Sequence, residues 1–195
     1  MTPRRVLIVG GGSAGWMAAA YLEAALRNKG RQPVEISLVE SPDVPRIGVG
    51  EATIPNIKHI LAVIGIDPIE FLKRVDGTFK QAIKYVNWLH GRGEYYYHAF
   101  DTYRVQPIDR AALRWHMSDR SISFGETTSV QPVVCDLGLC PVPARGTEFG
   151  QPLKFAYHMN ALKFADLLCE IGTSRGVKHY RDHVTDVEMT ERGDI

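Results

Sequence analysis

The sequence predicts an α/β fold with a parallel sheet, and three features of its first forty residues carry that prediction. Residues 6–9 form a continuous, mostly β-branched apolar run, typical of a strand buried on both faces. Residues 10–15 follow at once with the spacing G-x-G-x-x-G, and a helical pattern begins behind them. A second strand is expected over 34–39, and Glu40 closes it. This order of elements is that of the Rossmann-type dinucleotide-binding fold.

Each glycine of the turn has a mechanical reason. Gly10 lets the chain leave the strand in a tight turn, Gly12 lets backbone N–H groups approach a pyrophosphate, and Gly15 lets the helix pack closely on the strand. The helix N-terminus then offers donors to phosphates. Glu40 can accept hydrogen bonds from ribose hydroxyls and would repel a 2′-phosphate. The turn therefore predicts a bound adenine dinucleotide other than NADP, and the alternative is a plain glycine turn.

The composition excludes several other classes of protein. The 195 residues include 23 Lys and Arg against 22 Asp and Glu, a formal net charge of +1, and 45% are hydrophobic. This balance gives no electrostatic case for nucleic acid or an anionic membrane, and it rules out a disordered chain. No apolar run reaches the roughly 18 residues of a membrane-spanning helix. Three cysteines predict neither a disulfide framework nor a metal site, so we expect a cytoplasmic protein with free thiols.

Residues 41–56 interrupt the regular pattern after Glu40. Three prolines and the pair Gly48 and Gly50 lie in this stretch, and such glycines allow a close approach of the backbone to a ligand. The residues alone leave two interpretations open, a surface loop or a strap along the isoalloxazine end of a flavin.

The remaining elements follow from hydrophobic periodicity. We expect helices over 57–64, 68–75, 110–118 and 161–171, the last capped by Asn160, and strands over 78–88, 177–180 and 184–189, with a hairpin turn at 191–194. On one strand, Lys80 and Lys84 would share a face. Residues 95–100 are an aromatic cluster that suits either a core or a pocket for a flat ligand. Residues 130–152 are expected to form a long excursion or lid.

Five segments together resemble the flavin-dependent tryptophan halogenases, over most of the chain. They are Gly10 to Ala19, Val39 to Pro55, Gly77 to Trp88, Tyr96 to Phe100 and Ala156 to Ala161. The resemblance implies the N-terminal, FAD-binding portion of such an enzyme. It divides the chain into a dinucleotide unit (1–40), a flavin strap (41–56), a substrate-side insertion (57–152) and a return to the FAD-binding sheet (153–195).

The resemblance also implies a reaction and a set of site residues. A separate flavin reductase would supply reduced FAD, and O₂ and chloride or bromide would be co-substrates that yield hypohalous acid. Lys80 falls on the family's catalytic lysine, and His98 and Phe100 fall where members line the pocket for the small aromatic substrate. The implied FAD-binding residues are Gly10, Gly12, Ser13, Ala14, Gly15, Trp16, Glu40, Ile47, Gly48, Val49, Gly50, Glu51, Ala52, Thr53 and Val184.

Some features of the family are absent from this sequence. Its Trp-x-Trp-x-Ile-Pro motif and the glutamate that partners the lysine are missing, and Asn160 replaces the usual Asp. We therefore expect the N-terminal part of something longer, acting on tryptophan, free indole or another electron-rich arene. The alternatives are a flavin-dependent hydroxylase and a FAD-binding module without turnover. A homodimer is left open.

Overall fold

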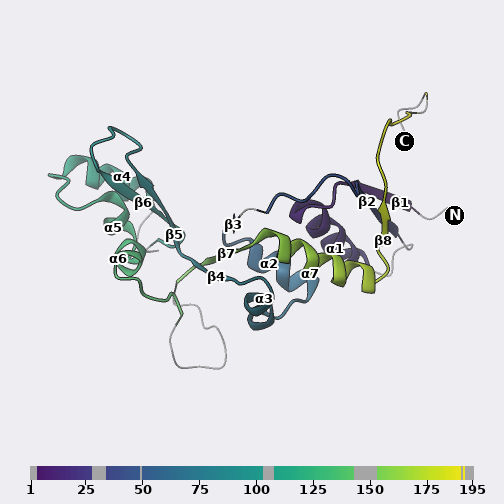
Figure 1. Ribbon diagram of the computed structural model, residues 1–195. Helices are drawn as coiled ribbons and strands as arrows, with labels where there is room; N and C mark the ends of the chain where they lie inside the picture. The colour runs from purple at the N-terminus through teal and green to yellow at the C-terminus, as the bar shows by residue number, and fades with distance from the viewer. Residues whose placement is uncertain are drawn as a thin grey trace. The chain divides into compact units, whose positions relative to one another are not determined.

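The fold is described from a computed structural model that covers residues 4–27, 34–48, 50–102, 108–142, 153–189 and 191 (Figure 1). The chain divides into two compact units. Unit 1 comprises residues 1–51, 58–77 and 159–195, and unit 2 comprises residues 52–57 and 78–158. Each unit is described by itself.

Unit 1 is built on a parallel sheet with the strand order β1-β2-β8. Strand β1 (Arg4–Val9) pairs with β2 (Val34–Glu40), and β2 pairs with β8 (Lys178–Arg181), both in parallel. Helix α1 (Ser13–Arg27) connects the first two strands. The strand, glycine turn, helix and second strand predicted from the sequence are therefore confirmed. Parallel strands require such a crossover connection.

Helix α7 (Ala161–Ser174) packs on α1, and the core of unit 1 lies between these helices and the sheet (Figure 1). Asn160 caps α7 as predicted, because its side chain accepts hydrogen bonds from Leu162 N and Lys163 N. The largest fully buried side chains of this core are Trp16, Leu38, Phe164 and Leu168.

The expectation that the first strand is buried on both faces is wrong for the described residues. The side chain of Ile8 faces Gly15 of α1, whereas Leu7 and Val9 point to the opposite side and are 59% and 62% exposed. A strand presents alternate residues to its two faces. The helices described here cover only one of them, so an apolar run does not by itself show that both faces are covered.

Two further helices in unit 1 match the predicted ranges. Helix α2 spans Ile57–Ile64, and α3 spans Pro68–Arg74, one residue shorter than expected. Asp67 caps α3 by accepting hydrogen bonds from two backbone N–H groups of its first turn. Phe71 of α3 packs edge-on against Phe164 of α7.

Unit 2 contains the segment that was expected to be one strand over 78–88. The structure instead places β4 (Thr78–Lys80) and β5 (Ala82–Val86) in different sheets, with a break at Gln81. The Gln81 carbonyl accepts a hydrogen bond from Phe100 N, and its side-chain amide donates to Leu139 O. These long-range bonds end one strand and start the next, so the expectation that Lys80 and Lys84 share a strand face is wrong.

The two sheets of this region are small. Strand β4 pairs in antiparallel fashion with β7 (Ala156–Asn160), in a sheet of order β3-β7-β4 that includes β3 (Gly50–Ala52). Strand β5 forms an antiparallel hairpin with β6 (Tyr95–Ala99).

Three helices complete unit 2. Helix α4 (Ile108–Met117) confirms the helix expected over 110–118, and α5 (Phe124–Thr128) was not expected. Helix α6 (Gln131–Asp136) occupies the start of the stretch expected to be an irregular excursion. That expectation is wrong for residues 131–136, and positions 143–152 lie outside the described residues.

The prediction of a strand over 184–189 is also wrong. Apolar alternation favours an extended backbone, but a strand needs a neighbour to accept its ladder hydrogen bonds. No described residue pairs with this segment. Residues 192–194 of the expected hairpin turn, and Ile195, lie outside the described residues. No described helix is long and apolar enough to cross a membrane.

The close packing of α1 on the glycine turn yields a test of stability. A Cβ at Gly15 would overlap the Gly10 carbonyl, whereas a Cβ at Gly12 would meet no atom within 4 Å. Replacing Gly15 with alanine should therefore lower the free energy of unfolding by about 1–3 kcal/mol, the usual cost of overpacking. Urea denaturation measures it, with Gly12→Ala as the matched control. Equal stability of the two variants would contradict this packing.

Candidate functional site

A cavity of about 480 Å³ lies in unit 1 at the carboxyl ends of β1 and β2. Ligands of open α/β folds bind at this end of the strands. Three segments form the walls: the glycine turn, the start of the strap and the chain after β8. The lining residues are Val9, Gly10, Gly11, Gly12, Val39, Glu40, Ser41, Val44, Pro45, Arg46, Asp182, His183 and Val184.

The glycine turn has the geometry that a phosphate-binding turn requires. Gly10 has a φ of 108°, which side chains strongly disfavour, and its N–H donates to Val39 O at 2.8 Å. Gly12 is exposed, and its carbonyl accepts the hydrogen bond of Trp16 N at 3.1 Å, which starts helix α1. The space in front of Gly12 is open to a ligand, and a side chain there would project into it.

Glu40 is held in this cavity by two basic side chains. Arg46 Nη2 and Nε donate to Glu40 Oε1 and Oε2 at 2.9 and 3.2 Å, and His179 Nε2 lies 2.8 Å from Oε1. Burial alone would raise the pKa of Glu40, but the hydrogen bonds and charges of Arg46 and His179 outweigh it and lower that pKa. Glu40 is therefore a fixed carboxylate at the tip of β2, as ribose recognition requires.

The segment after β8 lies along the same strand end. Asp182 N donates to Glu40 O at 3.0 Å, and His183 Nε2 lies 2.7 Å from Asp43 Oδ2. These contacts bring Val184 into the cavity wall. The sequence singled out Val184 but not Asp182 or His183, because no local pattern shows which side chains this segment meets.

Other residues expected to bind FAD lie outside this cavity. Trp16 is fully buried, with its ring edge-on to His179 at 4.9 Å, so the structure assigns it to the core. Ser13 donates to Ala161 O at 3.2 Å and so ties α1 to α7. Ala14 is exposed on the first turn of α1.

Only the first part of the strap lines the cavity, and the residues predicted to bind FAD in its second part have other surroundings. Ile47 is 80% exposed, and a Cβ at Gly48 would meet Leu162 at 3.0 Å. Val49 lies outside the described residues. Gly50, Glu51 and Ala52 form β3. In unit 2, Thr53 and Tyr157 exchange hydrogen bonds, since Thr53 N donates to the Tyr157 carbonyl and Tyr157 N donates to Thr53 Oγ1.

The structure adds Gly11 and Arg46 to the residues predicted for the cavity. A Cβ at Gly11 would overlap the carboxylate of Glu40, so only glycine lets that carboxylate lie over the turn. Arg46 belongs to the strap over 41–56 that is expected to lie along the flavin, but the sequence does not single it out. It is the one basic residue of that strap, and its contacts with Glu40 and Asp166 emerge only from the structure.

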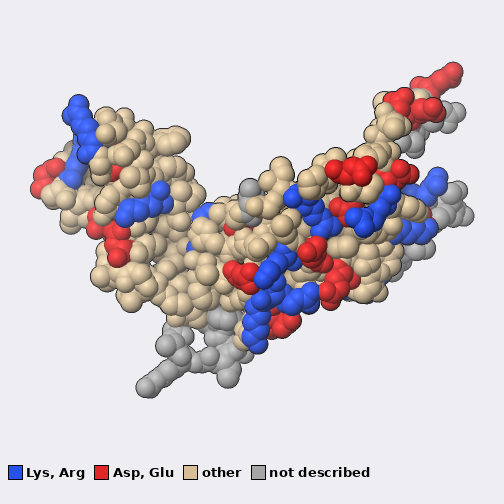
Figure 2. Space-filling view, viewed as in Figure 1, with Lys and Arg blue, Asp and Glu red and all other residues tan. Residues whose placement is uncertain are grey.

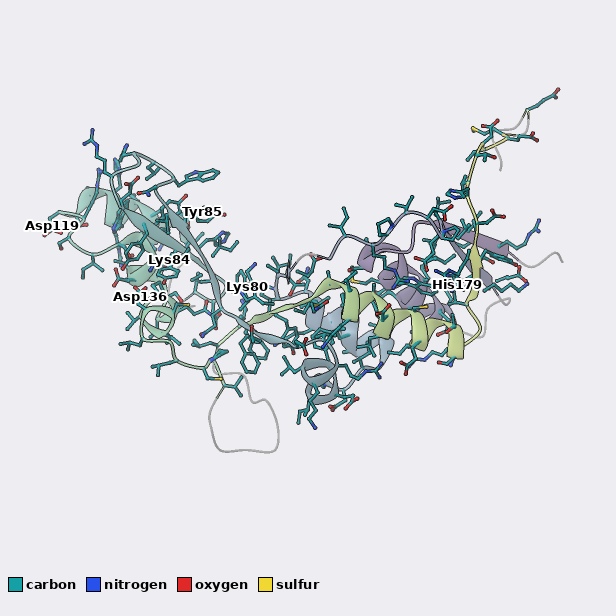
Figure 3. The ribbon with its side chains drawn as sticks, viewed as in Figure 1. Lys80, Lys84, Tyr85, Asp119, Asp136 and His179 are labelled. Atoms are coloured by element: carbon teal, nitrogen blue, oxygen red, sulfur yellow. The ribbon has the colours of Figure 1, made fainter. Side chains whose placement is uncertain are left out.

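Lys80 lies in unit 2 at the end of β4 and is only 9% exposed (Figure 3). Its Nζ makes no hydrogen bond or ion pair with any residue in the described part of the chain, and it lies 5.4 Å from the centre of the Phe100 ring. Burial lowers the pKa of Lys80. An ammonium that loses water without gaining a counter-charge moves toward the neutral, nucleophilic amine.

Lys84, only four positions further along, has the opposite surroundings. Its Nζ donates to Asp136 Oδ1 at 2.9 Å (Figure 3). The same Nζ lies over the ring of Tyr95. Hydrogen bonds to Asp136 and Tyr97 raise the pKa of Lys84. The two lysines were expected to share one strand face, but their pKa values are shifted in opposite directions.

The expected substrate residues are separated as well. Phe100 lies beside Lys80, whereas His98 is exposed on β6 opposite Ile83. Tyr95 and Tyr97, in the same aromatic cluster, donate hydrogen bonds to Asp136. Those two tyrosines therefore fasten the hairpin to helix α6.

Metal ligands do not gather in either unit. No group of three or more His, Cys, Asp or Glu among the described residues is placed to hold a metal ion.

On the face of unit 1 seen in Figure 2, acidic and basic side chains alternate over the surface.

Comparison with known proteins decides the family. The family profile described as "Tryptophan halogenase" matches residues 5–195. The chain belongs to the tryptophan halogenase family. It is 33% identical over 211 residues to tryptophan 7-halogenase RebH of Lentzea aerocolonigenes, which covers 98% of this chain and 38% of RebH.

Solved halogenase structures share this fold. A tryptophan halogenase from Shewanella frigidimarina superposes with a TM-score of 0.85 at 35% identity, over 98% of this chain and 38% of that one. Tryptophan 6-halogenase SttH of Streptomyces toxytricini gives 0.80 at 33% identity, over 97% and 37%. The chain thus corresponds to the N-terminal portion of tryptophan halogenases and spans about two fifths of their length.

The contrast between the two lysines can be measured directly. Because Lys80 is desolvated and Lys84 is paired with a carboxylate, Lys80 should titrate at a lower pH than Lys84. Reductive methylation with ¹³C-labelled formaldehyde followed by NMR titration gives both midpoints, with Lys80→Arg and Lys84→Arg variants assigning the signals. Titration of Lys80 at or above the midpoint of Lys84 would contradict the described surroundings.

Proposed function

We propose that this protein is the FAD-binding portion of a flavin-dependent halogenase that acts on tryptophan, indole or another electron-rich arene. The observation that carries the proposal is Lys80, a buried amine that has no counter-charge among the described residues, at the position where the resemblance to the family implies the catalytic lysine. The substrate, the halide and a flavin reductase as partner are parts of the same proposal.

The cavity of unit 1 suits the adenosine diphosphate half of FAD. This cavity of about 480 Å³ lies against the three consecutive glycines of the turn, which have no side chains. The carboxylate of Glu40 forms part of one wall. Gly10 and Gly12 would hold the pyrophosphate, Glu40 the ribose, and Val184 the adenine end by a backbone contact. Bound in its reduced form, FAD would supply two electrons to O₂, and the halide would supply two more, so that O₂ ends as hypohalous acid and water.

Lys80 can use that oxidant in two ways. As an ammonium it donates a hydrogen bond to hypohalous acid and holds the halogen toward the arene. As an amine it attacks the halogen, forming an N–halogen bond and releasing water, and then returns the halogen to the arene carbon in exchange for a proton. The burial that lowers the pKa of Lys80 favours the second route. Phe100, next to Nζ, offers an aromatic wall to the substrate.

The phosphate-binding role of the turn has its own test. Gly12→Val places a branched side chain in the open space before the turn, where its Cβ would meet no described atom within 4 Å. FAD binding, followed by the quenching of flavin fluorescence, should fall at least a hundredfold, because the side chain displaces the pyrophosphate. Thermal unfolding of Gly12→Val, compared with wild type, checks that the variant is folded. Wild-type affinity in Gly12→Val would exclude the assignment.

The role of Lys80 is tested by separating binding from turnover. Lys80→Ala should abolish halogenation of tryptophan or indole while FAD binding stays within about threefold of wild type, because Lys80 is not among the residues that line the cavity. Lys84→Ala is the matched control and should keep its turnover. Halogenation by Lys80→Ala at the wild-type rate, or a loss of FAD binding, would count against the proposed role.

A further inference from the structure

The Glu40 carboxylate has almost no acceptor capacity left, and this limits how it can bind a ribose. An ionised carboxylate offers about four lone-pair positions and no donor. Oε1 accepts from Arg46 Nη2 and from His179 Nε2, which must be the donor because its partner is a carboxylate. Among the described residues, Oε2 accepts a hydrogen bond from Arg46 Nε alone. One position remains, on Oε2, the oxygen that lies over Gly11 at the turn.

Arg46 is itself held from a second side. Its Nη1 donates to Asp166 Oδ1 of α7 at 2.6 Å while Nε and Nη2 grip Glu40, and the Arg46 side chain is 21% exposed. A guanidinium with five donors in a rigid fork can hold two carboxylates in one plane. A lysine could supply the positive charge, but it lacks the planar pair of donors with which Arg46 binds both carboxylate oxygens of Glu40.

An anionic ligand in this cavity requires the positive charge of Arg46 beside the carboxylate of Glu40. A diphosphate at the glycine turn would meet the negative charge of Glu40, and Asp182 lines the same cavity. Arg46 is the basic side chain that faces Glu40 from the strap, and His179 faces it from β8. Without Arg46 the carboxylate would gain rotational freedom and would repel the phosphates.

We propose that Arg46 is a positioning residue for adenine-dinucleotide binding, which holds the Glu40 carboxylate so that Oε2 accepts a hydrogen bond from one ribose hydroxyl. This inference rests on the proposed FAD site. It goes further in naming the residue that orients Glu40 and in limiting the contact to a single hydroxyl.

The experiment measures the affinity of the purified protein for ADP, 2′-deoxy-ADP and 3′-deoxy-ADP by calorimetry, in wild type, Arg46→Gln and Arg46→Lys. In wild type, loss of one of the two hydroxyls should weaken binding about tenfold, the effect of a hydrogen bond to a charged group, and loss of the other less than threefold. Arg46→Gln should weaken ADP binding about tenfold and reduce the larger hydroxyl penalty below threefold.

Two variants separate orientation from charge. Arg46→Lys keeps the positive charge, so it should restore part of the ADP affinity but not the hydroxyl penalty. Arg74→Gln removes an arginine that pairs with Glu170 of α7 and does not line the cavity, so it should keep the tenfold penalty. Thermal unfolding of each variant checks that the protein is folded.

The outcomes separate the failure of this inference from the failure of the proposed function. A wild-type protein that binds neither FAD nor ADP would overturn both. Wild-type binding with an unchanged hydroxyl penalty in Arg46→Gln would overturn the role of Arg46 alone, as would a full penalty in Arg46→Lys. Equal penalties for both hydroxyls in wild type would overturn the single-hydroxyl contact.

Discussion

The close approach of helix α1 to the end of strand β1 is the constraint on which unit 1 depends. Gly15 packs directly on the Gly10 carbonyl, which fixes where the helix begins and aims its N-terminus at the cavity. The same helix buries Trp16 against Gly172, and Ser13 bonds to the first residue of α7. The cavity at the strand ends and the core of unit 1 therefore both depend on one glycine contact.

Local signals account for what the sequence predicted well. The glycine spacing, the Asn160 cap and the apolar periodicity of the helices each act within a few residues, and the corresponding elements are confirmed. The parallel pairing of the first two strands follows from the helix that joins them. Family membership was also predictable, because the distinctive segments are spread over most of the chain.

The errors share a different cause, which is that long-range contacts override local pattern. Gln81 breaks a strand because it bonds to Phe100 and Leu139, and neither partner can be found from periodicity. The expected strand over 184–189 has extended propensity but no neighbour in the described part of the chain. Arg46 could not be chosen among other loop residues without seeing that it reaches both Glu40 and Asp166.

Each unit contains a charged side chain that is removed from water, but the electrostatic surroundings of the two side chains differ. Glu40 is partly buried yet ionised, because Arg46 and His179 offset the cost of removing it from water. Lys80 is buried without such an offset from any described residue, so its ammonium form is disfavoured. A paired charge suits recognition of a ligand, and an unpaired one suits reaction. This difference is part of the argument for the proposal that unit 1 binds FAD and that unit 2 carries the reactive lysine.

Mass spectrometry of the product tests the proposed function most directly. The protein is supplied with reduced FAD, O₂ and bromide together with tryptophan or indole. The account predicts a brominated arene, recognised by the paired isotope peaks of bromine, whose yield depends on bromide. A hydroxylated arene that forms equally well without halide would contradict it and would identify a flavin-dependent hydroxylase instead.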